Sequence, residues 1–237
     1  MNRLRSAFSM LEMSIVLLVI GMIVSAIIVA GHMMQAARLN EIITQMSGYR
    51  QAVEGFRLKY ITFPGDAPNA TGFWADTANG DGDDRIESAE QLRAWQHLQL
   101  SGFIHGSYTG QDAGTPDYEI DINVPGSTID GAYYILSYNE VYTATAGTFG
   151  NNVQLVTTED DVDPQGGAIT AKEARMIDMK LDGSANPAGG SLFVLRSDNN
   201  KATASSCVDQ NYTTSSSASY VISDTSTSCR LLLWLDN

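Results

Sequence analysis

One acidic stretch, NGDGDDRIESAE, carries the side chains best suited to binding a metal ion. Calcium prefers roughly six to eight oxygen ligands, and a final carboxylate can close the shell with both of its oxygens. The sixth position of the stretch is Asp84 rather than glycine, and no helix is evident before it. The stretch therefore predicts either a calcium site or a plain turn that caps the next helix. Positions one, three, five, seven (through its carbonyl), nine and twelve of the calcium pattern are Asn79, Asp81, Asp83, Arg85, Glu87 and Glu90.

Glu12 is the second residue whose chemistry needs an explanation. It lies at the front of an apolar run, and residues 13–31 carry no charge. At about 1.5 Å per residue that run just covers a hydrocarbon core of about 30 Å. A carboxylate within such a segment costs roughly 2.5–3.5 kcal/mol, and less near the interface. This cost predicts a partner cation for Glu12; the alternative is an incidental glutamate at the membrane surface.

Cys207 and Cys229 are the only two cysteines, and they bracket a Ser/Thr-rich stretch near the C-terminus. In an exported chain such a pair predicts one disulfide. Closing the loop is worth roughly 3 kcal/mol on the chain-entropy model. The alternative is a pair of unpaired thiols in a cytosolic protein, and the N-terminal segment favours export instead.

Other chemistry is not indicated by the sequence. The three histidines (His32, His97 and His105) share no spaced cluster with the cysteines or with each other, so zinc is not expected. Nucleophile-elbow, phosphate-loop and dinucleotide motifs are absent, so we expect no enzyme and no required cofactor beyond possible calcium. With 14 Lys+Arg against 27 Asp+Glu, a net charge of -13 excludes a phosphate-binding stripe and hence a nucleic-acid partner.

The elements that must position these residues begin with one long helix over 8–60. No proline interrupts this segment, and Pro64 ends it. The segment predicts a helix of about 80 Å, apolar all round over 8–31 and amphipathic over 32–60. Alternating spacings of three and four define its apolar stripe: Leu39, Ile42, Met46, Tyr49, Val53, Phe56 and Tyr60.

The remaining residues, 61–237, predict one globular α/β unit that ends in the disulfide region. A short helix ending near Gly102 is expected to direct Leu92, Trp95 and Leu98 into the core. A second helix is expected to begin with a capping box of Thr170 and Glu173. The predicted fold class is α+β, a long N-terminal helix packed on a small antiparallel sheet. The expected strands are 118–124 and 132–138 (paired as a hairpin), 153–157, 191–197, 219–223 and 229–236.

The N-terminal sequence SAFSMLEMSIVLLVIGM resembles the processing signal of type IV pilins and of the pseudopilins of type II secretion. In that family a prepilin peptidase removes a short basic leader, and the new N-terminal phenylalanine is methylated. The resemblance implies a leader over 1–7, cleavage between Ala7 and Phe8, and Glu12 as the fifth mature residue. Ala7 replaces the usual glycine, and Val29 stands where many members have a kinking proline.

The resemblance also implies a role for Glu12, since in the family this carboxylate is thought to meet the N-terminal amine of a neighbouring subunit. The implied function is a structural subunit of a type IV pilus-like filament, with identical or related pilin subunits as partners. The precursor is expected in the inner membrane with Arg3 and Arg5 in the cytoplasm and the globular unit in the periplasm. The mature protein then forms an extracellular pilus or a periplasmic pseudopilus. The alternatives are a pseudopilin of type II secretion and a membrane-anchored, calcium-dependent binding protein that does not assemble.

Overall fold

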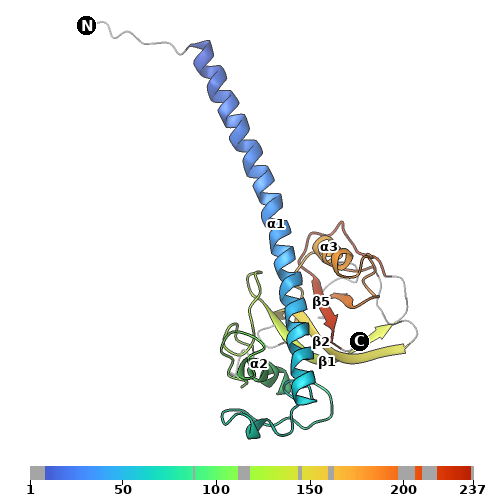
Figure 1. Cartoon of the computed structure of the whole chain (residues 1–237). Coiled ribbons are helices and arrows are strands. Elements are labelled where there is room, and N and C mark those ends of the chain that lie inside the picture. Colours follow the sequence, from blue (N-terminus) through green and yellow to red (C-terminus); the bar gives the residue numbers. More distant parts are fainter. Residues whose placement is uncertain are drawn as a thin grey trace. The chain divides into compact units, whose positions relative to one another are not determined.

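The computed structural model describes residues 9–87, 89–111, 118–143, 146–159, 163–196, 206–209 and 218–235, without the side chains of 139–149, 159, 163–165 and 196. The chain divides into two compact units, Met1–Asn40 and Glu41–Asn237, which we call the apolar unit and the globular unit. The division falls within the first helix, α1 (Met10–Tyr60), which is 51 residues long (Figure 1). The expected long N-terminal helix is therefore confirmed.

The part of α1 that belongs to the globular unit is amphipathic, as its spacing predicts. Ile42, Met46, Val53 and Phe56 are fully buried, and Tyr49 and Tyr60 are half-buried. The helix ends where the N–H of Ile61 donates to the carbonyl oxygen of Arg57 at 2.8 Å. Burial of one continuous stripe explains why this part is helical, because helices in proteins are stabilised mainly by packing of the apolar face.

The globular unit is built on a small antiparallel sheet, which confirms the α+β class. Its strand order is β1-β2-β5-β4, with β3 paired to β2. The strands enclose a core that includes Leu136, Val153, Val194 and Leu231, all fully buried. Two helices complete the unit, α2 (Glu90–Leu100) and α3 (Ala171–Leu181). The strands are β1 (Ala132–Thr143), β2 (Ala146–Glu159), β3 (Asp163–Gly166), β4 (Leu192–Arg196) and β5 (Cys229–Trp234).

The predicted hairpin between 118–124 and 132–138 is wrong. Strand β1 pairs instead with the longer β2, from Ala132 opposite Thr157 to Thr143 opposite Ala146. Residues 118–124 form turns in which the carbonyl oxygen of Glu119 accepts from the N–H groups of residues 122–124. The side chain of Asn123 also accepts the Glu119 N–H at 2.7 Å. Asn and Asp side chains bond their own backbone in this way, which favours a turn over a strand.

The predicted strand over 219–223 is also wrong, since only Tyr220 makes a bridge, to Val208. The two helix predictions are confirmed. Leu92, Trp95 and Leu98 on α2 are buried, and α3 begins with the capping box of Thr170 and Glu173. Strands β4 and β5 lie within the predicted 191–197 and 229–236.

The disulfide between Cys207 and Cys229 is present, with the two Cα atoms 5.3 Å apart. Both cysteines are fully buried. The bond joins the segment 206–209 to the start of β5, so the C-terminal region is fixed to the sheet. The prediction of one disulfide is confirmed.

The two strands that end the main order, β1 and β4, donate hydrogen bonds away from the sheet. On β1, the N–H of Tyr134 donates to the carbonyl oxygen of Pro125 at 2.9 Å, and that of Tyr138 donates to Ile86 at 2.7 Å. On β4, the N–H of Val194 donates to the carbonyl oxygen of Pro187 at 3.0 Å. Irregular segments therefore occupy part of each edge.

Candidate functional site

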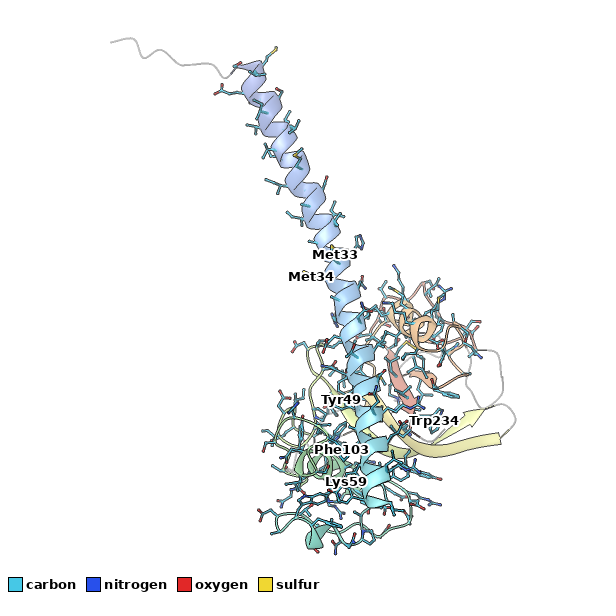
Figure 2. The ribbon with its side chains drawn as sticks, in the orientation of Figure 1. Met33, Met34, Tyr49, Lys59, Phe103 and Trp234 are labelled. Carbon is cyan, nitrogen blue, oxygen red and sulfur yellow. A yellow bond between two sulfur atoms is a disulfide. The ribbon has the colours of Figure 1, made fainter. Side chains whose placement is uncertain are left out.

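The apolar unit exposes an unusually large apolar surface. The large apolar side chains on α1 between Met10 and Met34 are all exposed, from 46% for Val19 to 94% for Met10. Figure 2 shows the side chains projecting outward along this part of the helix. By its length and composition α1 can cross a membrane. The exposed residues are Met10, Leu11, Met13, Ile15, Val16, Leu17, Leu18, Val19, Ile20, Met22, Ile23, Val24, Ile27, Ile28, Val29, Met33 and Met34.

Glu12 lies in the first turn of α1. Its Oε2 accepts the backbone N–H of Ser9 at 3.1 Å, and the Ser9 Oγ accepts the N–H of Leu11 at 3.2 Å. These two bonds satisfy donors that the start of a helix leaves unpaired. Glu12 therefore also has a local role as a cap, which the Ser-x-x-Glu spacing of residues 9–12 could have revealed. Ala7 and Phe8, the predicted cleavage and methylation site, lie outside the described residues.

A second group of polar residues lies in the globular unit. Carboxylate oxygens of Asp66, Asp81 and Glu90 lie within 4.8 Å of one another. Asp66 is fully buried, Glu90 is 7% exposed and Asp81 is exposed. The structure thus brings together two of the six predicted calcium ligands and adds a third carboxylate that the sequence pattern does not include.

The carboxylate of Asp66 accepts hydrogen bonds from the backbone of the acidic stretch and so fixes its conformation. Its Oδ1 accepts the N–H groups of Gly82 at 2.6 Å and Asp83 at 3.1 Å, and its Oδ2 accepts that of Asp84 at 2.9 Å. Asp84 adopts a φ of +67°, in the left-handed region that favours glycine at this position of a calcium loop. Asp66 comes 13 residues before Asn79, so the calcium pattern could not find it. The only signal in the sequence is its place in a Pro-Gly-Asp turn.

The other four predicted ligands have different partners. The side chain of Asn79 accepts the N–H of Thr71 at 2.9 Å. Asp83 accepts the N–H of Arg85 at 3.0 Å, and the Arg85 guanidinium pairs with the carboxylates of Asp83 at 3.8 Å and Glu87 at 3.6 Å. Asn79 and Glu87 line the same hollow as Asp81 and Glu90, while Asp83 and Glu87 do not belong to the group of carboxylates formed by Asp66, Asp81 and Glu90. The guanidinium contacts do not test Arg85, whose predicted ligand is its carbonyl oxygen.

Burial raises the pKa of both Asp66 and Glu90, while backbone N–H groups oppose the shift. Two nearly buried carboxylates beside a third negative group are unfavourable unless a proton or a cation compensates. Asp81 and Glu90 line an open hollow of about 300 Å³ together with Asn79, Glu87 and Arg93, and Asp66 is not part of this lining. The oxygens of Asp66, Asp81 and Glu90, which lie within 4.8 Å of one another, could supply part of a calcium shell, with carbonyls and water for the rest.

Helix α2 holds the loop that carries Asp66. His97 is fully buried; its Nδ1 accepts the N–H of Gly65 at 2.9 Å, and its Nε2 lies 3.0 Å from the Oγ1 of Thr77. Burial lowers the pKa of His97 to about 4, so the ring is neutral at neutral pH and can accept this bond. His97 is therefore a positioning residue for the loop, which explains a histidine that the sequence left without a role.

Comparisons of this chain with protein-family models, with curated proteins and with solved structures found no match. Its function therefore has to be argued from the two groups of residues described above.

Proposed function

We propose that this chain is a structural subunit of a type IV pilus-like filament, in which the N-terminal helices of many processed copies bundle together. The observation that carries the proposal is the apolar unit, whose exposed side chains from Met10 to Met34 need a covering of lipid or of neighbouring helices. The resemblance of the N-terminus to the prepilin signal supports the same conclusion.

Glu12 distinguishes a bundle from a simple anchor. Lipid tails satisfy the apolar side chains of this helix, but they offer nothing to a carboxylate. An amine at a cleaved Phe8 on a neighbouring copy would compensate the charge of Glu12, and each unpaired group would be penalised in a low dielectric. Pairing of the two charges therefore favours one register of the helices.

The experiment compares Glu12→Gln with Glu12→Ala in the full chain. Glutamine can replace glutamate as the acceptor for the Ser9 N–H, but it has no charge. If charge pairing matters, both variants insert into the membrane and neither assembles, with filament yield reduced at least tenfold on electron micrographs. Glu41→Ala, an exposed glutamate elsewhere on α1, is the matched control and should assemble normally.

Wild-type filament yield for Glu12→Gln would leave Glu12 only its capping role and would reject the charge pairing. Absence of filaments from the wild-type chain would reject the filament proposal. Mass spectrometry of the native N-terminus is the companion measurement, because it detects cleavage before Phe8 and methylation together. Surface fibres would identify a pilus, whereas a short product retained in the periplasm would identify a pseudopilus of type II secretion.

The second candidate function is calcium-dependent binding by a membrane-anchored protein. The observation that favours it is the convergence of Asp66, Asp81 and Glu90 within 4.8 Å. Calcium binding is also compatible with a filament subunit. The following test therefore decides only whether the chain binds calcium, and not whether it assembles.

Calcium that binds only the folded chain stabilises it by about 2.7 kcal/mol at 100 times the dissociation constant. For a chain of this size we expect the midpoint of thermal unfolding to rise by about 5–10 °C. Glu90→Gln keeps an acceptor for the Asp81 N–H but removes a charged ligand, so most of the rise should disappear. Asp76→Asn, outside the group, should keep it. An identical midpoint with calcium and with a chelator would reject the site.

A further inference from the structure

Helix α3 presents one polar stripe to solvent. Residues at positions i, i+3, i+4, i+7 and i+8 of a helix lie on one face, and on α3 this face is exposed. The two methionines are 38% and 49% exposed, and they lie among three cationic side chains. The members of this stripe, which we call the α3 stripe, are Lys172, Arg175, Met176, Met179 and Lys180.

The α3 stripe is positive in a chain that is strongly negative overall. All residues of α3 are described, and its two acidic residues do not belong to the stripe: Glu173 is held in the capping box and Asp178 is buried. Asp182, which follows the helix, accepts the N–H of Leu192 at 2.9 Å. Arginine and methionine are enriched at protein interfaces, and methionine adapts well to irregular surfaces.

The same chain carries a surface of opposite charge. Between η1 (Ala70–Gly72) and α2, five exposed carboxylates accompany one exposed cation, Arg85. Figure 1 shows this segment and α3 toward opposite ends of the globular unit. The five residues, which we call the acidic segment, are Asp76, Asp81, Asp83, Asp84 and Glu87.

We propose that the α3 stripe docks on the acidic segment of a second copy of this chain. The proposal rests on the proposed function and adds the contact that its globular units make. Two different patches that complement each other at opposite ends of one unit form a heterologous contact, which repeats from copy to copy and can extend into an open helical assembly. Such a contact also offsets the repulsion expected between copies of charge -13.

A second copy is favoured over an anionic lipid surface because the chain itself supplies the complementary charges. Exposed ion pairs contribute little individually and are weakened by salt. Several pairs around the two methionines therefore give a contact that depends strongly on ionic strength, and this dependence is the property to measure.

The test uses the full chain in non-ionic detergent, with self-association followed by sedimentation. We expect wild-type association to weaken at least tenfold between about 50 and 500 mM salt, where the screening length falls to a few ångströms. The double variant Lys172→Glu/Arg175→Glu should associate at least tenfold more weakly than wild type at low salt. Adding Asp76→Lys/Glu87→Lys to this double variant should restore association, because the α3 stripe is then more negative and the acidic segment more positive, and the two surfaces again have opposite charges at these positions.

The matched control is Arg57→Glu/Lys59→Glu, which makes the same change in net charge at two exposed cations of α1 and should leave association unchanged. Circular dichroism and the intact Cys207–Cys229 bond verify folding. If the double variant fails to fold, Lys172→Gln/Arg175→Gln takes its place with the same expected loss.

If the double variant associates as strongly as wild type, this inference is wrong. If the double variant forms normal filaments, this inference is also wrong, but the filament proposal is not affected. Salt-sensitive association with charge-swap rescue but no filament would support the inference and reject the filament. Loss of binding to vesicles containing phosphatidylglycerol, with unchanged self-association, would assign the α3 stripe to lipid and overturn the inference.

Discussion

Asp178 lies on the inner face of α3 and is fully buried. Its Oδ2 accepts the hydroxyl of Tyr220 at 2.9 Å, and this bond and the backbone N–H of Asn186 both favour the charged form. Burial raises its pKa to about 6, and the neighbouring negative charge of Asp182 adds to the shift. This carboxyl group holds part of the disulfide region against α3, so its protonation should affect stability.

The sign of the pH effect follows from the raised pKa. Between the unfolded pKa of 3.8 and the folded pKa of about 6, the folded chain keeps a proton that the unfolded chain has lost. Stability should therefore fall as the pH rises through this window, by at most about 3 kcal/mol. Asp178→Asn should remove this fall, as measured by urea unfolding of the full chain in mild detergent at pH steps from about 4 to 7.

Asp130→Asn, at an exposed acid, is the control for Asp178→Asn. Other carboxylates with raised pKa values, including Asp66 and Glu90, contribute the same pH dependence of stability to wild type and to both variants. The difference between the pH profiles of these proteins therefore reports Asp178 alone. Parallel pH profiles for wild type and Asp178→Asn would contradict the assignment.

At the residue scale, the sequence predicts what depends on near neighbours. The capping box of Thr170 and Glu173 and the pairing of Cys207 with Cys229 were predicted from short spacings or from counting. Asp66 was missed because its bonds to the acidic stretch depend on how an intervening loop folds back. Glu12 stands out in the sequence as a charge beside an apolar run, and the Ser-x-x-Glu spacing of residues 9–12 also indicates its cap on Ser9.

The two helices α1 and α2 end differently, and this difference can be measured. Ile61, after α1, has a φ of +60°, whereas Gly102, after α2, has a φ of +81°. A left-handed conformation is costly for a β-branched residue and nearly free for glycine. We expect Ile61→Gly to raise the free energy of unfolding by about 1 kcal/mol despite the greater entropy of glycine.

Gly102→Ala is the reciprocal variant. A Cβ at this position would meet no atom within 4 Å, so its effect reports backbone conformation alone. We expect it to lower the free energy of unfolding by about 1 kcal/mol. Chemical denaturation of the two variants beside wild type checks both values, and changes of the same sign would refute this account of the helix ends.

At the element scale, periodicity predicted the helices better than the sheet. The stripe on α1 is long and regular, and tertiary packing reinforces it. Residues 118–124 alternate like a strand, but Asp121 and Asn123 form turns instead. Strands β1 and β2 are predicted only in part, as 132–138 and 153–157, and the sequence does not indicate their pairing. The part that is not predicted includes Gly147, Gly150, Asn151 and Asn152, and Gly and Asn are depleted in strands.

At the scale of the whole molecule, the two units have opposite solvent requirements. The globular unit buries its own core, and eight large apolar side chains among its described residues are exposed, most strongly Leu58, Ile61, Phe73 and Ile222. The apolar window of α1 is not buried at all. The chain therefore combines a segment suited to lipid or to a helix bundle with a unit suited to water.

This division predicts that a fragment of residues 41–237 folds without the apolar unit. We expect it to remain soluble without detergent in about 0.5 M salt, which screens contacts between copies. It should form the Cys207–Cys229 bond and unfold within about 5 °C of the full chain in mild detergent. Sedimentation and thermal denaturation test this, and aggregation of the oxidised fragment would show that the apolar unit is needed for folding.

The hydrogen bonds made by the outer strands have a consequence for association. A bare sheet edge invites a strand from another molecule, which is the usual route to cross-β aggregation. Here the N–H groups of Tyr134, Tyr138 and Val194 already have acceptors on Pro125, Ile86 and Pro187. At these positions the edges of β1 and β4 are closed to a strand from a neighbouring molecule, which lowers the tendency toward cross-β growth there.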